Sequence, residues 1–291
     1  MDSEKCAIVL SILKNGSMSA AAEELNYTQS GISRAVESLE KTVGFPILQR
    51  GRNGVSLTRE GNELLPSMRE MAYWAERFNQ TVQKLHGLQT GRLVVGSSCV
   101  KFFPMLTRIV SDFHERYPGI TVELCSGTST ELAARMSDRA LDFAIISRRE
   151  GEFSSTVLMR DELVAMLPPN HPFAHNKSVS ATIFETEPYI EIHTGLQTDN
   201  TLCFNERGIT PNLSFSTPDS FIACGMVKAG LGVALVNRVV TGEMSDAVVY
   251  LPLDPPEYID ICAITPLDDV ISPAAKAFKS FFSKARISEE L

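Results

Sequence analysis

The sequence predicts a multidomain α+β protein: a winged helix-turn-helix at the N-terminus, then a long linker helix, then a two-lobed α/β domain. Three observations lead to this prediction. Roughly the first sixty residues hold short amphipathic helices and a hairpin pattern, the next thirty carry an apolar heptad repeat, and the rest alternates strand and helix patterns. With 291 residues and 44% hydrophobic content, the chain is long enough for two or three domains.

Two short helices are expected first. The apolar residues over 7–13 have helical spacing, and the Asn-Gly pair at 15–16 is a helix-ending signal. Ser17 or Ser19 then offers a hydroxyl N-cap to a second helix over 20–25. Its small alanines allow another helix to approach closely.

A third, longer helix is expected from the N-cap Thr28 to about Val43. Ile32, Val36, Leu39 and Val43 recur at i, i+4, i+7 and i+11, which predicts one buried stripe. The polar residues that fall on the opposite side are Gln29, Ser30, Ser33, Arg34 and Glu37. A short helix, a tight turn and a longer helix with such side chains at its start is the arrangement that reads base edges in the major groove. The alternative is an ordinary solvated face.

A small hairpin, or wing, is expected after this helix. The residues over 44–48 are predicted as a first strand, 51–54 as a tight turn, and 55–57 as the returning strand. Arg50 and Arg52 lie on this hairpin, where arginines can reach phosphates or the minor groove.

The charge distribution is compatible with a nucleic-acid interface near the N-terminus. The net charge is -8, but residues 1–90 carry ten basic and ten acidic side chains, so the whole excess lies in 91–291. The segment 28–59 is itself net +3. Whole-chain acidity therefore does not exclude a local phosphate-binding surface.

These N-terminal segments resemble the DNA-binding domain of LysR-type transcriptional regulators. The resemblance is carried by GSMSAAAEEL at 16–25, TQSGISR at 28–34, LEKTVG at 39–44 and LTREG at 57–61. It implies that Gln29, Ser33 and Arg34 lie on a recognition helix that Thr28 and Ser30 begin, with Arg50 and Arg52 on the wing. The family often has proline at position 30 and alanine at 31. Gly31 should weaken the helix by roughly 1 kcal/mol relative to alanine.

A long linker helix is expected over 59–90. Its apolar positions are spaced 4, 3, 4, 3, 4, 3, namely Leu64, Met68, Met71, Ala75, Phe78, Val82 and Leu85. This heptad seam predicts pairing with another helix, most simply in a homodimer. The alternative is an amphipathic helix packed on its own domain. Pro66 should kink the helix or delay its regular start.

The remaining residues predict a two-lobed α/β domain. Strands over 92–96, 120–124 and 141–146 alternate with helices over 104–117 and 130–136, which implies a parallel sheet with ligands at its carboxyl edge. A second lobe is expected to contain strands over 189–192, 213–215 and 232–236. The chain then crosses back over 261–265 to a last helix over 273–286.

The segments FHERYP at 113–118, LDFAI at 141–145 and AGLGVAL at 229–235 resemble the LysR-type effector domain, itself similar to periplasmic solute-binding proteins. The expected domains are therefore 1–58 for DNA binding, 59–90 as the linker, and 91–291 for effector binding. Within the last, lobe I takes 91–162 and 267–291, and lobe II takes 163–266.

The effector is expected in the cleft between the lobes. The candidate contacts are Ser97, Ser98, Cys99, Lys101, Thr128, Ser129, Ser147, His193 and Thr194. Hydroxyls and free N–H groups at helix starts favour carboxylate or phosphate oxygens, so an anionic small molecule is the expected effector. The alternative for any one position is an ordinary helix cap or loop residue.

Enzymatic and metal-dependent functions are disfavoured. His171 and His175 have the i, i+4 spacing of metal-binding helices, but the prolines at 168, 169 and 172 make this segment a poor helix. Nucleophile-elbow, P-loop and dinucleotide motifs are missing. No cofactor or metal is expected.

The cysteines are expected to be free thiols. The six are scattered without C-x-x-C spacing, as in proteins of a reducing compartment. One alternative is a redox-sensing Cys203–Cys224 disulfide.

A solute-binding protein of transport is the other class considered. The first residues lack an export signal, and no apolar run approaches the roughly 18 residues that span a bilayer. A cytoplasmic regulator is therefore expected. Its expected partners are double-stranded DNA, a small-molecule effector, and copies of itself in a dimer and tetramer, with RNA polymerase as a further candidate and no membrane.

Overall fold

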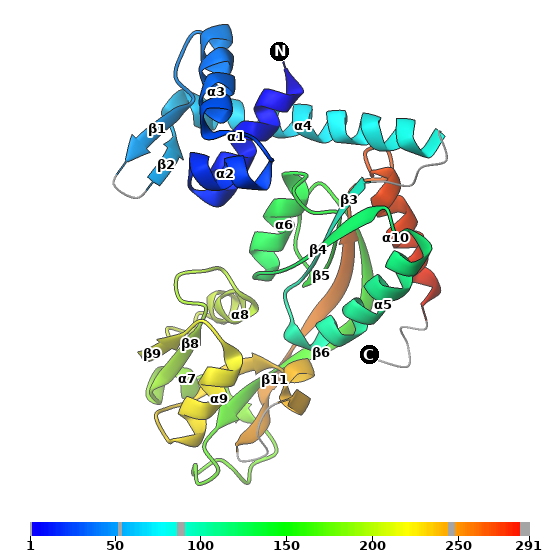
Figure 1. Ribbon diagram of the computed structural model, residues 1–291. Helices are drawn as coiled ribbons and strands as arrows, with labels where there is room; N and C mark the ends of the chain where they lie inside the picture. The colour runs from blue at the N-terminus through cyan, green and yellow to red at the C-terminus, as the bar shows by residue number, and fades with distance from the viewer. Residues whose placement is uncertain (1, 52–53, 86–90, 244–247, 286–291) are drawn as a thin grey trace.

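The computed structural model describes residues 2–51, 54–85, 91–243 and 248–285. Figure 1 shows an N-terminal domain of short helices with a hairpin, the long helix α4 (Arg59–Leu85), and two α/β bodies below it. We call the body next to α4 lobe I and the far body lobe II.

The N-terminal domain contains the three predicted helices, α1 (Ser3–Asn15), α2 (Met18–Glu24) and α3 (Gln29–Val43). Of the two serines considered, Ser17 caps α2, because its hydroxyl accepts from the N–H groups of Ser19 and Ala20. The three helices share one buried core that contains Ile12, Ala21, Ile32, Val36 and Leu39. The predicted stripe of α3 is confirmed, with Val43 partly buried against the same core.

The wing forms, but its first strand starts later than predicted. The hairpin pairs β1 (Leu48–Gly51) with antiparallel β2 (Gly54–Leu57). The prediction of a strand over 44–48 was wrong because Gly44 ends α3 in a left-handed conformation. The carboxylate of Glu40 then accepts from the N–H of Ile47 (2.7 Å) and Leu48 (3.1 Å).

The start of β2 packs against the end of α1. Gly54 has φ +104°, and a Cβ at this position would lie 2.7 Å from the carbonyl oxygen of Gly16. The N–H of Val55 donates to the same oxygen at 3.2 Å. Position 54 therefore requires glycine for both its conformation and its space.

α4 begins at Arg59 and includes Pro66, so the proline does not delay its start. Leu64, Met68 and Met71 pack into the core of the N-terminal domain, and Met68 is fully buried. Farther along, Phe78 is 68% exposed. The heptad positions therefore fall into two groups. Those in the first half of α4 pack on the chain's own N-terminal domain, as the alternative to helix pairing predicted. In the second half, Phe78 remains on the surface.

Lobe I has the predicted β-α-β-α-β order: β3 (Gly91–Ser97), α5 (Phe103–Arg116), β4 (Ile120–Ser126), α6 (Ser129–Ser137) and β5 (Phe143–Ser147). A short 3-10 turn, η1 (Val100–Phe102), precedes α5. β3 lies between β4 and β5 and is parallel to both. The last helix, α10 (Pro273–Lys284), packs Phe278 and Phe282 against Phe143. The carboxyl ends of the parallel strands therefore share one edge.

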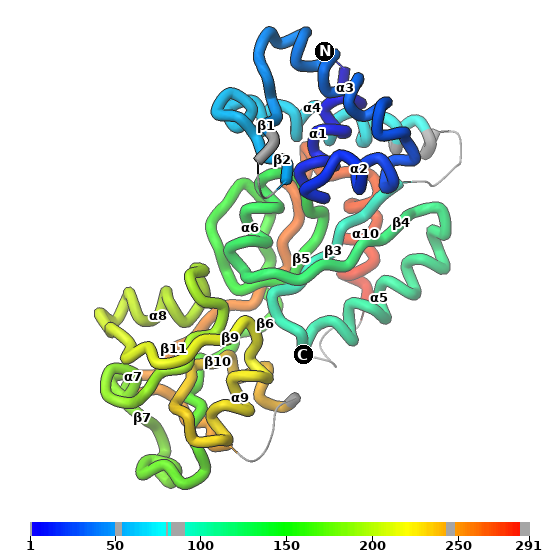
Figure 2. The backbone as a smooth tube through the Cα atoms, turned by 60° about the vertical axis from the view of Figure 1, so that its left-hand side comes forward, coloured from blue at the N-terminus to red at the C-terminus, as the bar shows by residue number. Residues whose placement is uncertain are grey.

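Two long antiparallel strands run through both lobes (Figure 2), β6 (Ser154–Leu167) and β11 (Val249–Thr265). The predicted return crossing over 261–265 is the end of β11, but strands of this length were not predicted. β11 was not predicted because the proline-rich segment 252–256 is typical of the end of a strand. In the structure the strand continues through this segment, with an irregularity in its pairing with β6 between Pro252 and Glu257.

Lobe II contains the three predicted strands, β8 (Tyr189–Ile192), β9 (Leu213–Thr217) and β10 (Ala234–Asn237). The sequence did not predict its helices α7 (Ile183–Thr186), α8 (Asp199–Arg207) and α9 (Ser220–Lys228). It also missed the short strand β7 (Val179–Ser180) and the 3-10 segment η2 (Arg238–Glu243).

The structure does not contain the disulfide considered between Cys203 and Cys224. All six cysteines are free thiols. Cys203 packs with Phe184 and Phe204, whereas Cys224 packs in a separate cluster with Val227.

Candidate functional site

The first candidate site is the exposed face of α3. Thr28 caps the helix by accepting from the N–H of Gly31 at 3.1 Å. Gln29, Ser30 and Arg34 are exposed beside it. Ser33 is half-buried and donates to the Glu37 carboxylate at 3.1 Å. The structure therefore leaves four of the five predicted α3 residues exposed and Ser33 half-buried, whereas Ile32, Val36 and Leu39 are buried.

The wing lies next to this face in sequence but is only partly described. Arg50 stands in β1 opposite Val55, and its side chain lies outside what the structure describes. Arg52 lies outside the described residues. The structure therefore defines this site only at α3, and not at the two wing arginines.

The second candidate site is a cavity of about 510 Å³ between the lobes. It lies where β3, β4 and β5 end, as expected for a parallel sheet. The predicted residues that line it are Ser97, Ser98, Cys99, Thr128, Ser129, Ser147 and His193. Lys101 and Thr194 are not among its lining residues. Lys101 instead lines a smaller hollow of about 350 Å³ beside α5, which shares Val100 and Phe103 with the cavity.

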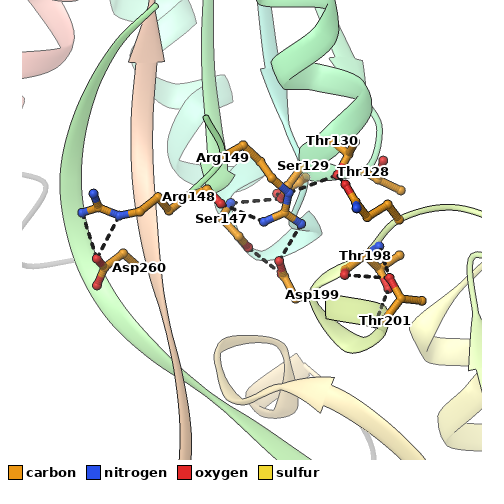
Figure 3. Close-up of polar contacts among 12 residues, drawn as sticks. Thr128, Ser129, Thr130, Ser147, Arg148, Arg149, Thr198, Asp199, Thr201 and Asp260 are labelled. Atoms are coloured by element: carbon orange, nitrogen blue, oxygen red, sulfur yellow. Dashed lines mark hydrogen bonds and ion pairs between the residues drawn. The ribbon is translucent and has the colours of Figure 1, made fainter. Parts of the chain in front are cut away.

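The lobe I hydroxyls form a connected series across the cavity (Figure 3). Ser129 Oγ donates to Ser98 Oγ at 3.0 Å and accepts from the N–H of Ser147 at 3.0 Å. Ser147 Oγ donates to the carboxylate of Asp199 at 2.6 Å. This last bond joins the two lobes, because Asp199 is the first residue of α8.

The same carboxylate binds an arginine that sequence reasoning missed. Arg149 Nη2 lies 2.8 Å from Asp199 Oδ1, and both side chains are nearly buried, at 11% and 12% exposed. Arg149 Nε donates to Thr130 Oγ1 at 3.0 Å. Its neighbour Arg148 turns away and pairs with Asp260, as Figure 3 shows. The sequence has two adjacent arginines directly after β5, at 148 and 149, but its pattern does not indicate which of them faces the cavity.

The helix starts around the cavity are already capped. Thr128 and Glu131 form a capping box on α6, Thr198 caps α8, and the Asp219 carboxylate accepts from two N–H groups of α9. The described lining residues include one arginine, Arg149, and three carboxylates, those of Glu131, Asp199 and Asp219.

Two lining residues have individual properties. Burial raises the pKa of the Cys99 thiol to about 11, so the thiol is protonated at neutral pH. His193 adopts φ +60°, a conformation rare for residues other than glycine, and strained backbone of this kind is common at binding sites.

The described residues give no support to a metal site. No group of three or more metal-ligating side chains occurs within the described ranges. The segment around His171 and His175 is a loop, in which His171 Nδ1 accepts from the N–H of Phe173 at 3.2 Å. Within the described residues, no helix has the length and apolarity needed to cross a membrane.

Comparison with known proteins agrees with this architecture. Residues 4–62 match the model of the bacterial regulatory helix-turn-helix proteins of the lysR family, and residues 86–286 match the LysR substrate binding domain. YvbU of Bacillus subtilis, an uncharacterized HTH-type transcriptional regulator, is 26% identical over 93% of this chain and 94% of its own. CmpR of Synechocystis, an HTH-type transcriptional activator, is 23% identical over 79% of this chain and 77% of its own.

Solved structures share the fold along nearly the whole chain. Full-length OxyR from Pseudomonas aeruginosa superposes with a TM-score of 0.71 at 15% identity, covering 97% of this chain and 94% of that one. CbnR, a LysR family regulator solved in complex with its target DNA, superposes with a TM-score of 0.61 at 18% identity, covering 98% and 99%. The two family models together cover most of the sequence, and the chain therefore belongs to the LysR family of bacterial transcriptional regulators.

Proposed function

We propose that this regulator binds double-stranded DNA through α3 and the wing, and that a small molecule in the interlobe cavity controls that binding. The observation that carries the proposal is the division of α3 into a stripe of apolar residues packed in the core and a set of exposed polar side chains. Gln29 and Arg34 in that set are the residues expected to contact base edges. CbnR, which shares the fold, was solved with DNA bound.

The cavity supports the second part of the proposal. It is of small-molecule size, it lies between two lobes, and its lining combines apolar side chains with hydroxyls and one ion pair. The predicted contacts at Ser97, Ser98, Cys99, Thr128, Ser129, Ser147 and His193 stay proposals, with Arg149 added. A ligand that prefers one angle between the lobes shifts the population toward that angle.

Self-association completes the proposed mechanism. The exposed Phe78, with Trp74 one turn before it, offers an apolar surface on α4 for the same helix of a second copy. A change in lobe angle would alter how dimers pack into a tetramer and so the spacing and bend of the bound DNA. The cytoplasm, where bacterial DNA lies, is the proposed location, and RNA polymerase is a further candidate partner.

The test is a DNA-binding measurement on the full-length protein. A gel shift and a footprint with the DNA upstream of its own gene should show protection of two half-sites, and candidate metabolites should change the footprint. Absence of a shift at low salt would refute the DNA-binding proposal. A footprint that no metabolite changes, although some bind the protein, would refute only the control by the cavity.

A further inference from the structure

The helix α6 has functional neighbours at both of its ends. Thr128 and Ser129, at its start, line the interlobe cavity. Asp138 and Arg139, just after its last residue, form ion pairs with α4. Figures 1 and 2 both place α6 on the side of lobe I that lies next to the N-terminal domain.

The contact with α4 consists of two adjacent ion pairs of opposite polarity. Arg69 of α4 pairs with Asp138, and Glu70 of α4 pairs with Arg139. The guanidinium of Arg139 also lies over the ring of Tyr73, with Cζ 5.2 Å from the ring centroid. Charge alternation of this kind fixes the register of α4 on lobe I, since a shift by one residue would bring like charges together.

Two further bonds hold the same stretch of α4 to lobe I. The Tyr73 hydroxyl donates to the carbonyl of Val270, and Arg77 Nη1 donates to the carbonyl of Asp269 at 3.0 Å. Both carbonyls belong to the segment before α10. Among the residues that the structure describes, the docked position of α4 is therefore held by polar contacts, which can exchange with water, rather than by a continuous apolar core.

The backbone at Arg139 indicates that its side chain matters. Arg139 has φ +56°, and its N–H donates to the carbonyl of Met136 at 3.1 Å, as in a helix end that usually carries glycine or asparagine. An arginine is strained in this conformation. What the residue supplies in return is the contact of its guanidinium with Glu70 and Tyr73.

The cavity end of α6 is bonded to the ion pair between the lobes. Thr130 Oγ1 accepts from Arg149 Nε at 3.0 Å, and Arg149 binds Asp199 of lobe II at 2.8 Å. Any change in the angle between the lobes that moves Asp199 acts on Arg149. Through Thr130, it acts on the first turn of α6.

The body of α6 connects its two ends rigidly. Leu132, Ala133 and Met136 are buried against Ala144 and Ile146 of β5. Nine helical residues span only about 13 Å. A displacement of the first turn must therefore be accompanied by one at Asp138 and Arg139.

We propose that α6 couples the interlobe cavity to the docking of α4 on lobe I, with Glu70 and Arg139 as positioning residues. The two states are α4 docked and α4 released, and occupancy of the cavity biases them through Thr130 and Arg149. This inference rests on the proposed function, because it takes the cavity as the effector site.

The test is a double-mutant cycle on full-length protein, with affinity for its own upstream DNA as the readout. Asp199→Asn disturbs the cavity, and Arg139→Glu disturbs the docking of α4. The combined effect should differ from the product of the single effects by about fivefold or more. Arg116→Glu, at the exposed end of α5, changes the net charge equally and should show no such coupling to Asp199→Asn. A multiplicative result for both pairs overturns the proposal and leaves the proposed function standing.

Hydrogen exchange supplies a readout that does not depend on DNA. Arg139→Glu should accelerate amide exchange over 128–131 as well as over 138–140, and the charge swap Glu70→Arg with Arg139→Glu should restore it. Acceleration confined to 138–140 and α4 would overturn the coupling. Asp199→Asn could leave DNA affinity unchanged both in the wild-type protein and in the Arg139→Glu variant. That result counts against control of DNA binding by the cavity, and hydrogen exchange then becomes the test of the coupling through α6.

Discussion

α3 and the interlobe cavity present their polar side chains in opposite ways. On α3 they come from one helix and are largely exposed, and the helix is held from behind by Ile32, Val36 and Leu39. In the cavity they come from strand ends and helix starts of both lobes and are bonded to one another, as in the series that joins Ser129, Ser147 and Asp199. A surface that binds a large partner keeps its donors free, whereas a cavity that opens and closes keeps its own groups satisfied.

The largest expected effect tests the support behind α3. Ile32→Ala removes a fully buried side chain and should lower the free energy of unfolding of the N-terminal domain by about 2 to 5 kcal/mol. Urea denaturation followed by circular dichroism measures the loss. Glu37→Ala, on the exposed face, is the control and should change stability by under about 0.5 kcal/mol. Equal losses for both variants would contradict the division of the helix into two faces.

The next effect concerns the exposed face itself. Arg34→Ala should weaken operator binding by about 1 to 3 kcal/mol if the guanidinium reads a base. Arg34→Lys keeps the charge but loses the planar fork, so it should retain nonspecific binding while losing sequence preference. Fluorescence anisotropy with specific and scrambled duplexes separates the two. An unchanged affinity for Arg34→Ala would remove this residue from the interface.

A smaller effect is expected for Arg149 in the cavity, and the adjacent Arg148, which points away from the cavity, provides the matched control. Arg149→Ala leaves the nearly buried Asp199 without its cation and should destabilise the C-terminal domain by about 1 to 2 kcal/mol, less than a fully buried pair because the cavity admits solvent. Arg148→Ala breaks an ion pair whose arginine is 55% exposed and should cost under about 1 kcal/mol. Urea denaturation of both variants makes the comparison, and the reverse order would contradict the assignment of Arg149 to the cavity.

The smallest effect distinguishes lobe I from the N-terminal domain by the pH dependence of their stability. Burial raises the pKa of Asp142 in lobe I to about 6, so its contribution to stability is complete below about pH 3.8 and is lost as the pH rises through 6. Hydrogen bonds from Ser11, Lys14 and Asn15 lower the pKa of Glu24 in the N-terminal domain to about 2. Its contribution is therefore present above about pH 4.5 and is lost as the pH falls toward 2.

Hydrogen exchange at pH 4 and pH 7, analysed by domain, measures these opposite trends. Asp142→Asn should remove a pH-dependent change of about 1 kcal/mol from the C-terminal domain only. Glu24→Gln should act only on the N-terminal domain and by less, because Glu24 is exposed. If the stability of both domains changed with pH in the same direction, Asp142 and Glu24 would not be the groups that determine their pH dependence.

The same contrast explains what the sequence could predict. The face of α3 follows from spacing within fifteen residues, so Gln29 and Arg34 were identifiable from the pattern alone. The loops at the carboxyl ends of β3, β4 and β5 follow from the β-α-β order, which led to Ser97, Ser98, Thr128 and Ser147.

The rest of the cavity depends on contacts between distant segments. Asp199 lies fifty positions from Arg149 in sequence, and nothing in its local pattern distinguishes it from the other acids at helix starts. β6 was missed because it is exposed in its first half and buried in its second, so that neither alternation nor a continuous apolar run marks its full length. The wing shifted because Glu40 bonds to N–H groups seven and eight residues away, a pairing that hairpin patterns do not register.

The burial of Met68 within the core of the N-terminal helices bears on how the protein can be divided. A fragment that stops at the end of the wing would lose this side chain and leave a hole among Ile12, Ile32 and their neighbours. The smallest fragment expected to fold by itself and still recognise an operator therefore continues through Met71, inside the long helix. Exchanging sensor modules between relatives would best join the chains beyond that point.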